Sequence, residues 1–216
     1  MGRWAEDANG RLRAAAMQLY VERGFEDTTV ADIAAKAGVT ARTFFRHFAD
    51  KREVLFAGSA ELQDALVAAL KGAPPEATPM QAVAAALDAA AEFLGQNREH
   101  SRQRQAIINS HADLLERELI KMARLADALA EGLRRRGVPE PDASLAAEAG
   151  VVVFRVAFSR WVAPDDHTDQ AGPDNGVAPG DGGRRGASRG EAGPGVSLRQ
   201  MMRDDLARLS EVTTQG

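Results

Sequence analysis

Apolar residues recur with helical spacing along most of this chain. Within residues 3–23, alanines, leucines and a tyrosine return every three or four positions, and one face of residues 111–136 repeats the pattern. Clusters of β-branched residues are rare, while alanine, leucine, arginine and glutamate, which favour helix, are abundant. The pattern predicts an all-α protein of about nine helices. Those beyond residue 79 are expected at 80–96, 99–109, 111–136, 141–163 and from Leu198 to Leu209.

The densest helix signals lie between residues 24 and 55. Thr29 with Asp32 forms a weak capping box, Gly38 suits a tight turn, and Thr40 can cap the following helix. A further helix is expected from Lys51 to about Lys71. Short helices at this spacing predict a helix-turn-helix, an arrangement that places one helix, about residues 41–48, in the major groove of DNA.

Two composition changes divide the chain. The segment GAPPEATP at residues 72–79 breaks the helical pattern, and residues 164–195 hold nine glycines, four prolines and almost no large apolar residue. The second segment cannot offset the entropy lost on ordering, which predicts a flexible loop. We therefore expect a helix-turn-helix domain at residues 1–56 and a ligand-binding and dimerisation domain at residues 57–216, with the loop inside it.

Composition narrows the class of protein. The chain is 44% hydrophobic and 27% charged, as in an ordinary water-soluble domain. The absence of cysteine excludes disulfide scaffolds, thiolate zinc sites and cysteine nucleophiles. The start MGRWAED lacks an apolar signal region, and charges interrupt the most apolar window, residues 143–162. These features predict a cytoplasmic protein without a membrane partner.

Net charge does not identify a nucleic-acid partner. The formal net charge is −4, and residues 1–52 carry nine lysines and arginines against seven aspartates and glutamates. Any basic face must therefore come from the placement of individual side chains. Charge alone neither supports nor excludes DNA binding.

Enzyme motifs are not found. None of the four histidines lies in a nucleophile, metal or phosphate-loop motif, and no strand precedes the glycine-rich segment. The sequence predicts no enzyme activity, no metal and no cofactor.

The run T-T-V-x-x-I-A-x-x-A-G-V-T-x-x-T-F-F-R-H-F-x-x-K-x-x-V-L within residues 10–56 resembles the DNA-binding domain of the TetR family of bacterial regulators. The resemblance implies an all-α homodimer with a three-helix reading head and a divergent C-terminal domain for ligand and dimerisation. Its last two helices are expected to form the dimer interface.

The candidate DNA contacts combine that resemblance with side-chain chemistry. Arg42 can pair with a guanine edge, and Ala41 is small enough to touch a thymine methyl group. Phe45 stands where many family members carry a phosphate-binding tyrosine, so it either stacks on sugar or base or belongs to the core. The full predicted set is Thr29, Ala41, Arg42, Thr43, Phe45, Arg46, His47 and Lys51.

A looser resemblance covers about residues 98–163. The run SRQRQAIINSHADLLERELIKMARLADALAEGLRRR is similar to C-terminal domains of a subgroup that includes the mycofactocin-system regulator. This resemblance implies an acyl-CoA-like ligand. Each candidate lining residue is also plausible as a core or interface residue. The predicted pocket residues are Phe93, Arg104, Ile108, Asn109, His111, Leu115, Phe154, Arg155 and Phe158.

Three functions remain open at this point. The first is a repressor released from a palindromic operator by a small apolar or acyl-CoA-like effector. The second is an activator or ligand-independent regulator with the same reading head. The third is an acyl-ligand-binding protein that does not bind DNA.

Overall fold

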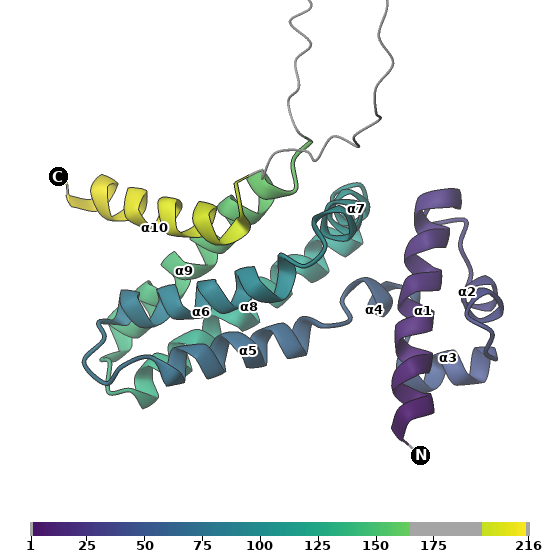
Figure 1. The fold of residues 1–216 in the computed structure, drawn as a ribbon, viewed down its shortest axis with the longest axis horizontal. Helices are drawn as coiled ribbons and strands as arrows, with labels where there is room; N and C mark the ends of the chain where they lie inside the picture. Colours follow the sequence, from purple (N-terminus) through teal and green to yellow (C-terminus); the bar gives the residue numbers. More distant parts are fainter. Residues whose placement is uncertain (1, 165–195, 215–216) are drawn as a thin grey trace, which may run out of the picture.

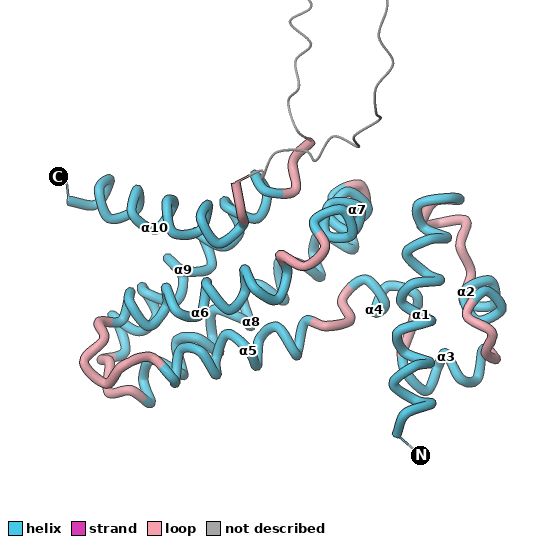
Figure 2. Tube along the Cα trace, in the orientation of Figure 1, coloured by secondary structure: helices cyan, strands magenta, loops and turns pink. Residues whose placement is uncertain are grey.

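The computed structural model describes residues 2–164 and 196–214, and every regular element in these two ranges is a helix (Figures 1 and 2). The all-α fold is confirmed. Apart from Pro164, the predicted flexible loop at 164–195 lies outside the described residues. The described helices are α1 (Gly2–Arg23), α2 (Val30–Lys36), α3 (Ala41–His47), α4 (Lys51–Leu55), α5 (Ser59–Gly72), α6 (Pro79–Leu94), α7 (Arg98–Asn109), α8 (Ala112–Arg135), α9 (Glu140–Trp161) and α10 (Leu198–Thr214).

Helices α1 to α4 form the reading head, in which α2 and α3 pack beside the long helix α1 (Figure 1). Its core holds the apolar stripe of α1 together with Phe25, Ile33 and Phe44, all buried. Ile108 of α7 and Leu114 of α8, both fully buried, belong to the same cluster. The head therefore completes its core with two side chains from beyond residue 56.

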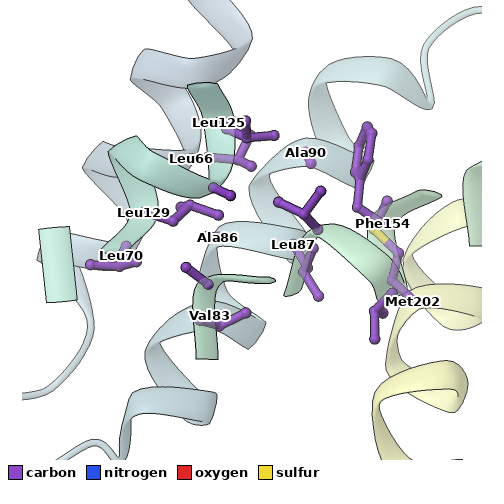
Figure 3. Packing of buried hydrophobic residues seen from close by; sticks show 14 of the residues in the cluster. Leu66, Leu70, Val83, Ala86, Leu87, Ala90, Leu125, Leu129, Phe154 and Met202 are labelled. Atoms are coloured by element: carbon purple, nitrogen blue, oxygen red, sulfur yellow. The ribbon is translucent and has the colours of Figure 1, made fainter. Parts of the chain in front are cut away.

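Helices α5, α6, α8, α9 and α10 pack around a second core, the body. Figure 3 shows Leu66 and Leu129 on one side of this core and Phe154 and Met202 on the other. Helix α9 is covered by α6, α8 and α10, which accounts for its nearly continuous apolar sequence. Gly150 lets α9 approach α6 closely, because a Cβ atom there would lie 2.5 Å from Cγ1 of Val83.

The predicted continuous helix from Lys51 to about Lys71 is wrong. Helix α4 ends at Leu55 and α5 begins at Ser59. Gly58 between them has φ = 91°, a left-handed conformation that glycine adopts without steric cost. Phe56 is buried in the head core, and the helix is interrupted at this point because the chain turns to place that side chain there. The head and the body therefore meet at a bend, residues 56–58, which we call the junction.

Candidate nucleic-acid interface and effector cavity

Side-chain caps fix the two helices of the helix-turn-helix. The hydroxyl of Thr29 accepts from the N–H of Asp32 (3.1 Å), and the Asp32 carboxylate accepts from the N–H of Thr29 (3.0 Å). The Asp32 carboxylate also accepts from the Thr29 hydroxyl, and the hydrogen bonds donated by this hydroxyl and by the Thr29 N–H hold the pKa of Asp32 below its usual value. Gly38 makes the turn with φ = 68°, and the hydroxyl of Thr40 caps α3 by accepting from the N–H of Thr43 (3.2 Å). The caps hold α3 at a fixed angle to α2.

Helix α3 divides into a buried side and an exposed side. Phe44 packs into the head core, and Phe48 is buried just after the helix. The other side of the helix is exposed. It carries Ala41 and Arg42 and, one helical turn later, Phe45 and Arg46. Neither arginine makes a hydrogen bond or ion pair with another described residue. The exposed side, which we call the α3 face, thus presents two unneutralised guanidinium groups and one aromatic ring to solvent.

The ring of Phe45 is 58% exposed and meets Phe44 edge to face, with 5.5 Å between ring centroids. The prediction left open whether Phe45 belongs to the core, and this exposure excludes that alternative. An exposed phenyl ring held by a neighbouring ring is suited to stacking or to apolar contact with a partner.

Two cavities share part of their lining. The first, about 540 Å³, is lined by the junction and by residues of α1, α5, α6, α7, α8 and α9. The second, about 470 Å³, lies between α7, α8 and α9. Phe154 and Phe158, stacked at 5.8 Å between centroids, line both. Volumes of this size are typical of small-molecule sites.

Comparison with known proteins identifies the type of the reading head. Residues 12–57 match the family profile described as "Bacterial regulatory proteins, tetR family". The reading head is therefore of the TetR type. A curated relative, the HTH-type transcriptional regulator TcmR of Streptomyces glaucescens, is 42% identical over 74 residues, which cover 34% of this chain and 33% of that one. The chain thus matches about a third of the length of this relative.

Two further relatives extend the likeness beyond the head. The HTH-type transcriptional activator FasR of Mycolicibacterium smegmatis is 26% identical over 172 residues, covering 76% of this chain and 77% of that one. The structure of Thermus thermophilus FadR, a TetR-family repressor in complex with lauroyl-CoA, matches with a TM-score of 0.52 at 23% identity, covering 94% and 93% of the two chains. At 23% identity, this likeness shows that the two chains share a fold.

Two hydroxyls of the predicted TetR-type contact set are engaged within the head. The Thr29 hydroxyl donates to the Asp32 carboxylate (2.5 Å) while it caps α2. The Thr43 hydroxyl lies 3.1 Å from that of Thr40. Each hydroxyl keeps acceptor or donor capacity for one further partner. Both hydroxyls therefore serve first as internal hydrogen-bonding groups of the head.

His47 and Lys51, the predicted phosphate contacts, are partly engaged within the head. The Nε2 atom of His47 is buried and makes no hydrogen bond with another described residue. The ammonium group of Lys51 donates to the carbonyl oxygens of Phe25 (2.8 Å), Glu26 (3.0 Å) and Thr28 (3.1 Å). It also lies 4.5 Å from the Phe25 ring centroid. Because its three N–H groups already have acceptors, Lys51 acts as a cross-link between α4 and the loop before α2.

Seven of the nine predicted pocket residues line a cavity. Phe93 and Arg104 line the first, Asn109, Leu115 and Arg155 line the second, and Phe154 and Phe158 line both.

Ile108 and His111 line neither cavity. Ile108 is in the head core, where its apolar side chain is fully buried. His111 packs its ring against Phe25 (5.0 Å between centroids), and its Nδ1 lies 2.8 Å from the carbonyl oxygen of Ile107. His111 was predicted as a polar residue on an otherwise apolar helix and Ile108 as an apolar lining residue, but both belong to the surroundings of the head core.

Of the ionisable residues on the first cavity, the sequence reasoning found only Arg104 and missed, among others, Arg13, His100 and Lys121. Arg13 and Lys121 each lie beside an apolar residue at the border of an amphipathic stripe, next to Leu12 and Met122. A cationic residue at the border of an apolar stripe could have indicated a cavity residue. Many lysines and arginines on the solvated surface occupy the same kind of position, so this pattern is not specific.

Other site types find no support in the described residues. There is no group of three or more histidine, aspartate or glutamate side chains placed to hold a metal ion within residues 2–164 and 196–214. None of the helices described there has the length and hydropathy needed to span a bilayer.

Proposed function

We propose that this chain is a ligand-responsive, DNA-binding transcriptional regulator that binds a palindromic operator as a homodimer. The observation that carries the proposal is the α3 face, where Arg42, Phe45 and Arg46 project from a short helix capped at Thr40. Guanidinium groups without an internal partner are suited to phosphates and guanine edges. Operator DNA as the partner also implies a cytoplasmic location.

Each exposed residue of the α3 face has a role in this proposal. Arg42, near the start of the helix, pairs with a guanine edge, and Ala41 allows close approach and meets a thymine methyl group. Phe45 stacks on a sugar or a base methyl group. Arg46 contacts the phosphate backbone, and the hydroxyls of Thr29 and Thr43 add contacts through their remaining hydrogen-bonding capacity.

The dimer is proposed to form through α9 and α10. Leu145, Val152 and Val156 of α9 are 70%, 49% and 46% exposed, and they lie along one line with Ala149, at spacings of four, three and four residues. Such an apolar stripe on a helix is suited to pairing with its own copy about a two-fold axis. Two reading heads then face successive major grooves.

The effector is proposed to be a small apolar or acyl-CoA-like molecule that occupies the body and releases the operator. The support is the position of the first cavity against the junction, where a ligand can bias the placement of the head. The solved structure of Thermus FadR contains lauroyl-CoA, and its fold is shared with this chain.

An activator is the second candidate, because the relative FasR is named a transcriptional activator. The sign of the change in expression of regulated genes after deletion separates the two. A drop on deletion supports activation, and a rise supports repression.

The test of DNA binding is replacement of Arg42 by alanine. Operators are first selected from a random duplex library with the wild-type protein. Arg42→Ala should weaken binding to the selected duplex by about 5- to 150-fold and relax preference at one base pair of each half-site. Arg135→Ala, which removes an exposed arginine of α8 paired with Glu131, serves as the matched control and should bind normally. Selection of no sequence at low salt would favour the third hypothesis, an acyl-ligand-binding protein without DNA binding.

A further inference from the structure

The first cavity is lined by two chemically different sets of side chains. Phe93, Leu94, Met122, Phe154 and Phe158 provide apolar surface from α6, α8 and α9. The lining also gathers ionisable nitrogen groups from helices that are far apart in the sequence. These are Arg13 of α1, His100 and Arg104 of α7, and Lys121 and Arg124 of α8.

Only part of this positive charge is neutralised. Arg104 is paired with Glu118 (2.9 Å), and its Nε donates to the carbonyl oxygen of Leu55 (2.6 Å). Within the part of the chain that the structure describes, Arg13 makes only a long hydrogen bond to the carbonyl oxygen of Ala57 (3.5 Å). The Lys121 ammonium has no hydrogen bond or ion pair with another described residue and lies 4.9 Å from the Phe56 ring centroid.

The acidic residues around the cavity are few. Glu118 is held by Arg104, and Asp64 lies exposed on the rim. Burial, followed by the charges of Arg13 and Arg104, lowers the pKa of His100. Burial is also the main cause that lowers the pKa of Lys121, which Glu53 and Glu118 oppose and Arg104 and Arg117 reinforce. Arg13 and Lys121 therefore bring positive charge to the cavity without an acidic partner among the described residues, and a bound anion would supply one.

Resting on the proposed function, we propose that the ligand of this cavity is an anionic amphiphile with its charged group between Arg13, His100 and Lys121. Its apolar chain lies against Phe93, Phe154 and Phe158. A carboxylate or a phosphate group satisfies the same donors, since both accept charge-assisted hydrogen bonds. A neutral molecule of the same length leaves two cations facing an apolar chain, which costs desolvation without compensation.

The same cations hold the junction between head and body. The Phe56 ring, 3% exposed, lies within 6 Å of the charged groups of Arg104 (5.4 Å), Arg117 (5.9 Å) and Lys121 (4.9 Å). Arg13 comes within 3.5 Å of a Cβ position at Gly58. An anion that draws Lys121 and Arg13 into the cavity weakens these contacts. The charged group of the ligand, rather than its chain, thus couples binding to the position of the head.

The experiment compares ligands of one chain length on the DNA-free full-length protein. Decanoate, decyl phosphate, 1-decanol and decyltrimethylammonium are titrated by calorimetry below their micellar concentrations. Decanoate or decyl phosphate should bind about 10- to 100-fold more tightly than 1-decanol, and the cation should not bind. The two anions distinguish a carboxylate from a phosphate ligand. Equal binding of 1-decanol, preference for the cation, or no binding of either anion would overturn the proposal.

Variants locate the charge effect. Lys121→Gln, on the surface of α8, should reduce the affinity of the preferred anion to about that of 1-decanol and leave 1-decanol unchanged. Arg13→Gln should act in the same way. Lys71→Gln, at the exposed end of α5 and outside the cavity, is the matched control. Anion preference that survives both cavity variants contradicts the assignment of these residues.

This test does not depend on DNA. If no operator is selected but anion preference and its loss in Lys121→Gln are observed, the proposed regulator fails and the ligand assignment stands. If operator binding is found but ligands show no charge preference, the ligand assignment fails and the regulator stands. Release of the selected operator by the preferred anion, and not in Lys121→Gln, supports the coupling through the junction.

Discussion

At the scale of single residues, Lys51 shows how a side chain in a DNA-binding motif can serve the fold. Its ammonium donates to three carbonyl oxygens and lies over the ring of Phe25. Lys51→Met keeps the stem and removes these bonds. We expect the free energy of unfolding to fall by about 1.5–3 kcal/mol, as for hydrogen bonds to a charged group. Chemical denaturation followed by circular dichroism measures the change.

The control is Lys36→Met, which removes a surface pair with Glu22 at 3.6 Å. Exposed pairs contribute little, so this variant should stay within about 0.5 kcal/mol of wild type. If Lys51→Met has wild-type stability but binds the operator weakly, Lys51 serves as the predicted phosphate contact and not as a cross-link of the fold.

The caps could be predicted residue by residue, whereas the contacts of long side chains could not. Thr29 and Thr40 bond to atoms three residues away, so their roles depend only on local sequence. Lys51 bonds to carbonyl groups more than twenty residues earlier, and Phe45 could be judged exposed only once the helix had a buried side. Spacing along the sequence carries no information on such distant partners.

At the scale of helices, the approach of α6 to α9 depends on Gly150. A Cβ atom at this position would lie 2.5 Å from Cγ1 of Val83, which is fully buried and cannot move freely. Gly150→Ala should therefore lower the free energy of unfolding by about 1–3 kcal/mol, despite the better helix propensity of alanine. Thermal and chemical denaturation measure it.

Gly10 provides the opposite case on α1. It is exposed, and a Cβ atom there would meet nothing within 4 Å. Gly10→Ala should raise the free energy of unfolding by about 1 kcal/mol through helix propensity alone. Equal effects of the two substitutions would show that α6 and α9 are not in close contact.

Helix boundaries could be predicted where a capping residue or a helix-breaking segment lies in the local sequence. The prediction was wrong at the junction. The apolar spacing of residues 51–71 continues through Gly58, so the pattern indicated one helix. The break arises because Phe56 is buried in the head core, packed there by residues of α7 and α8. Such a tertiary override of a continuous helical pattern cannot be read from periodicity.

At the scale of the whole molecule, the all-α class and the two cores were predictable because each follows from amphipathic stripes. The first cavity was not, since Arg13, His100 and Lys121 come from three helices whose packing the sequence does not specify. Ile108 also shows that the sequence does not specify which helices pack together. Its apolar character predicted burial, but the core that buries it belongs to the head.

The assembly can be tested through the exposed stripe of α9. Val152 is 49% exposed and central in the line formed with Leu145 and Val156. Val152→Asp places a carboxylate where two copies of α9 would meet, and burial of two unpaired like charges opposes association. Light scattering at micromolar concentration should give a dimer mass for wild type and a monomer mass for Val152→Asp. Operator affinity should fall as well, because two half-sites no longer bind as one unit.

The matched control is Val21→Asp. Val21 is exposed to a similar degree, 54%, but lies on α1 of the head, away from α9. The same change in charge and volume there should leave the dimer mass unchanged, which separates loss of an interface from a general effect of an added carboxylate. If Val152→Asp and Val156→Asp both retain the dimer mass, the two-fold axis does not pass along this stripe. The reading heads would then have to be paired through another surface.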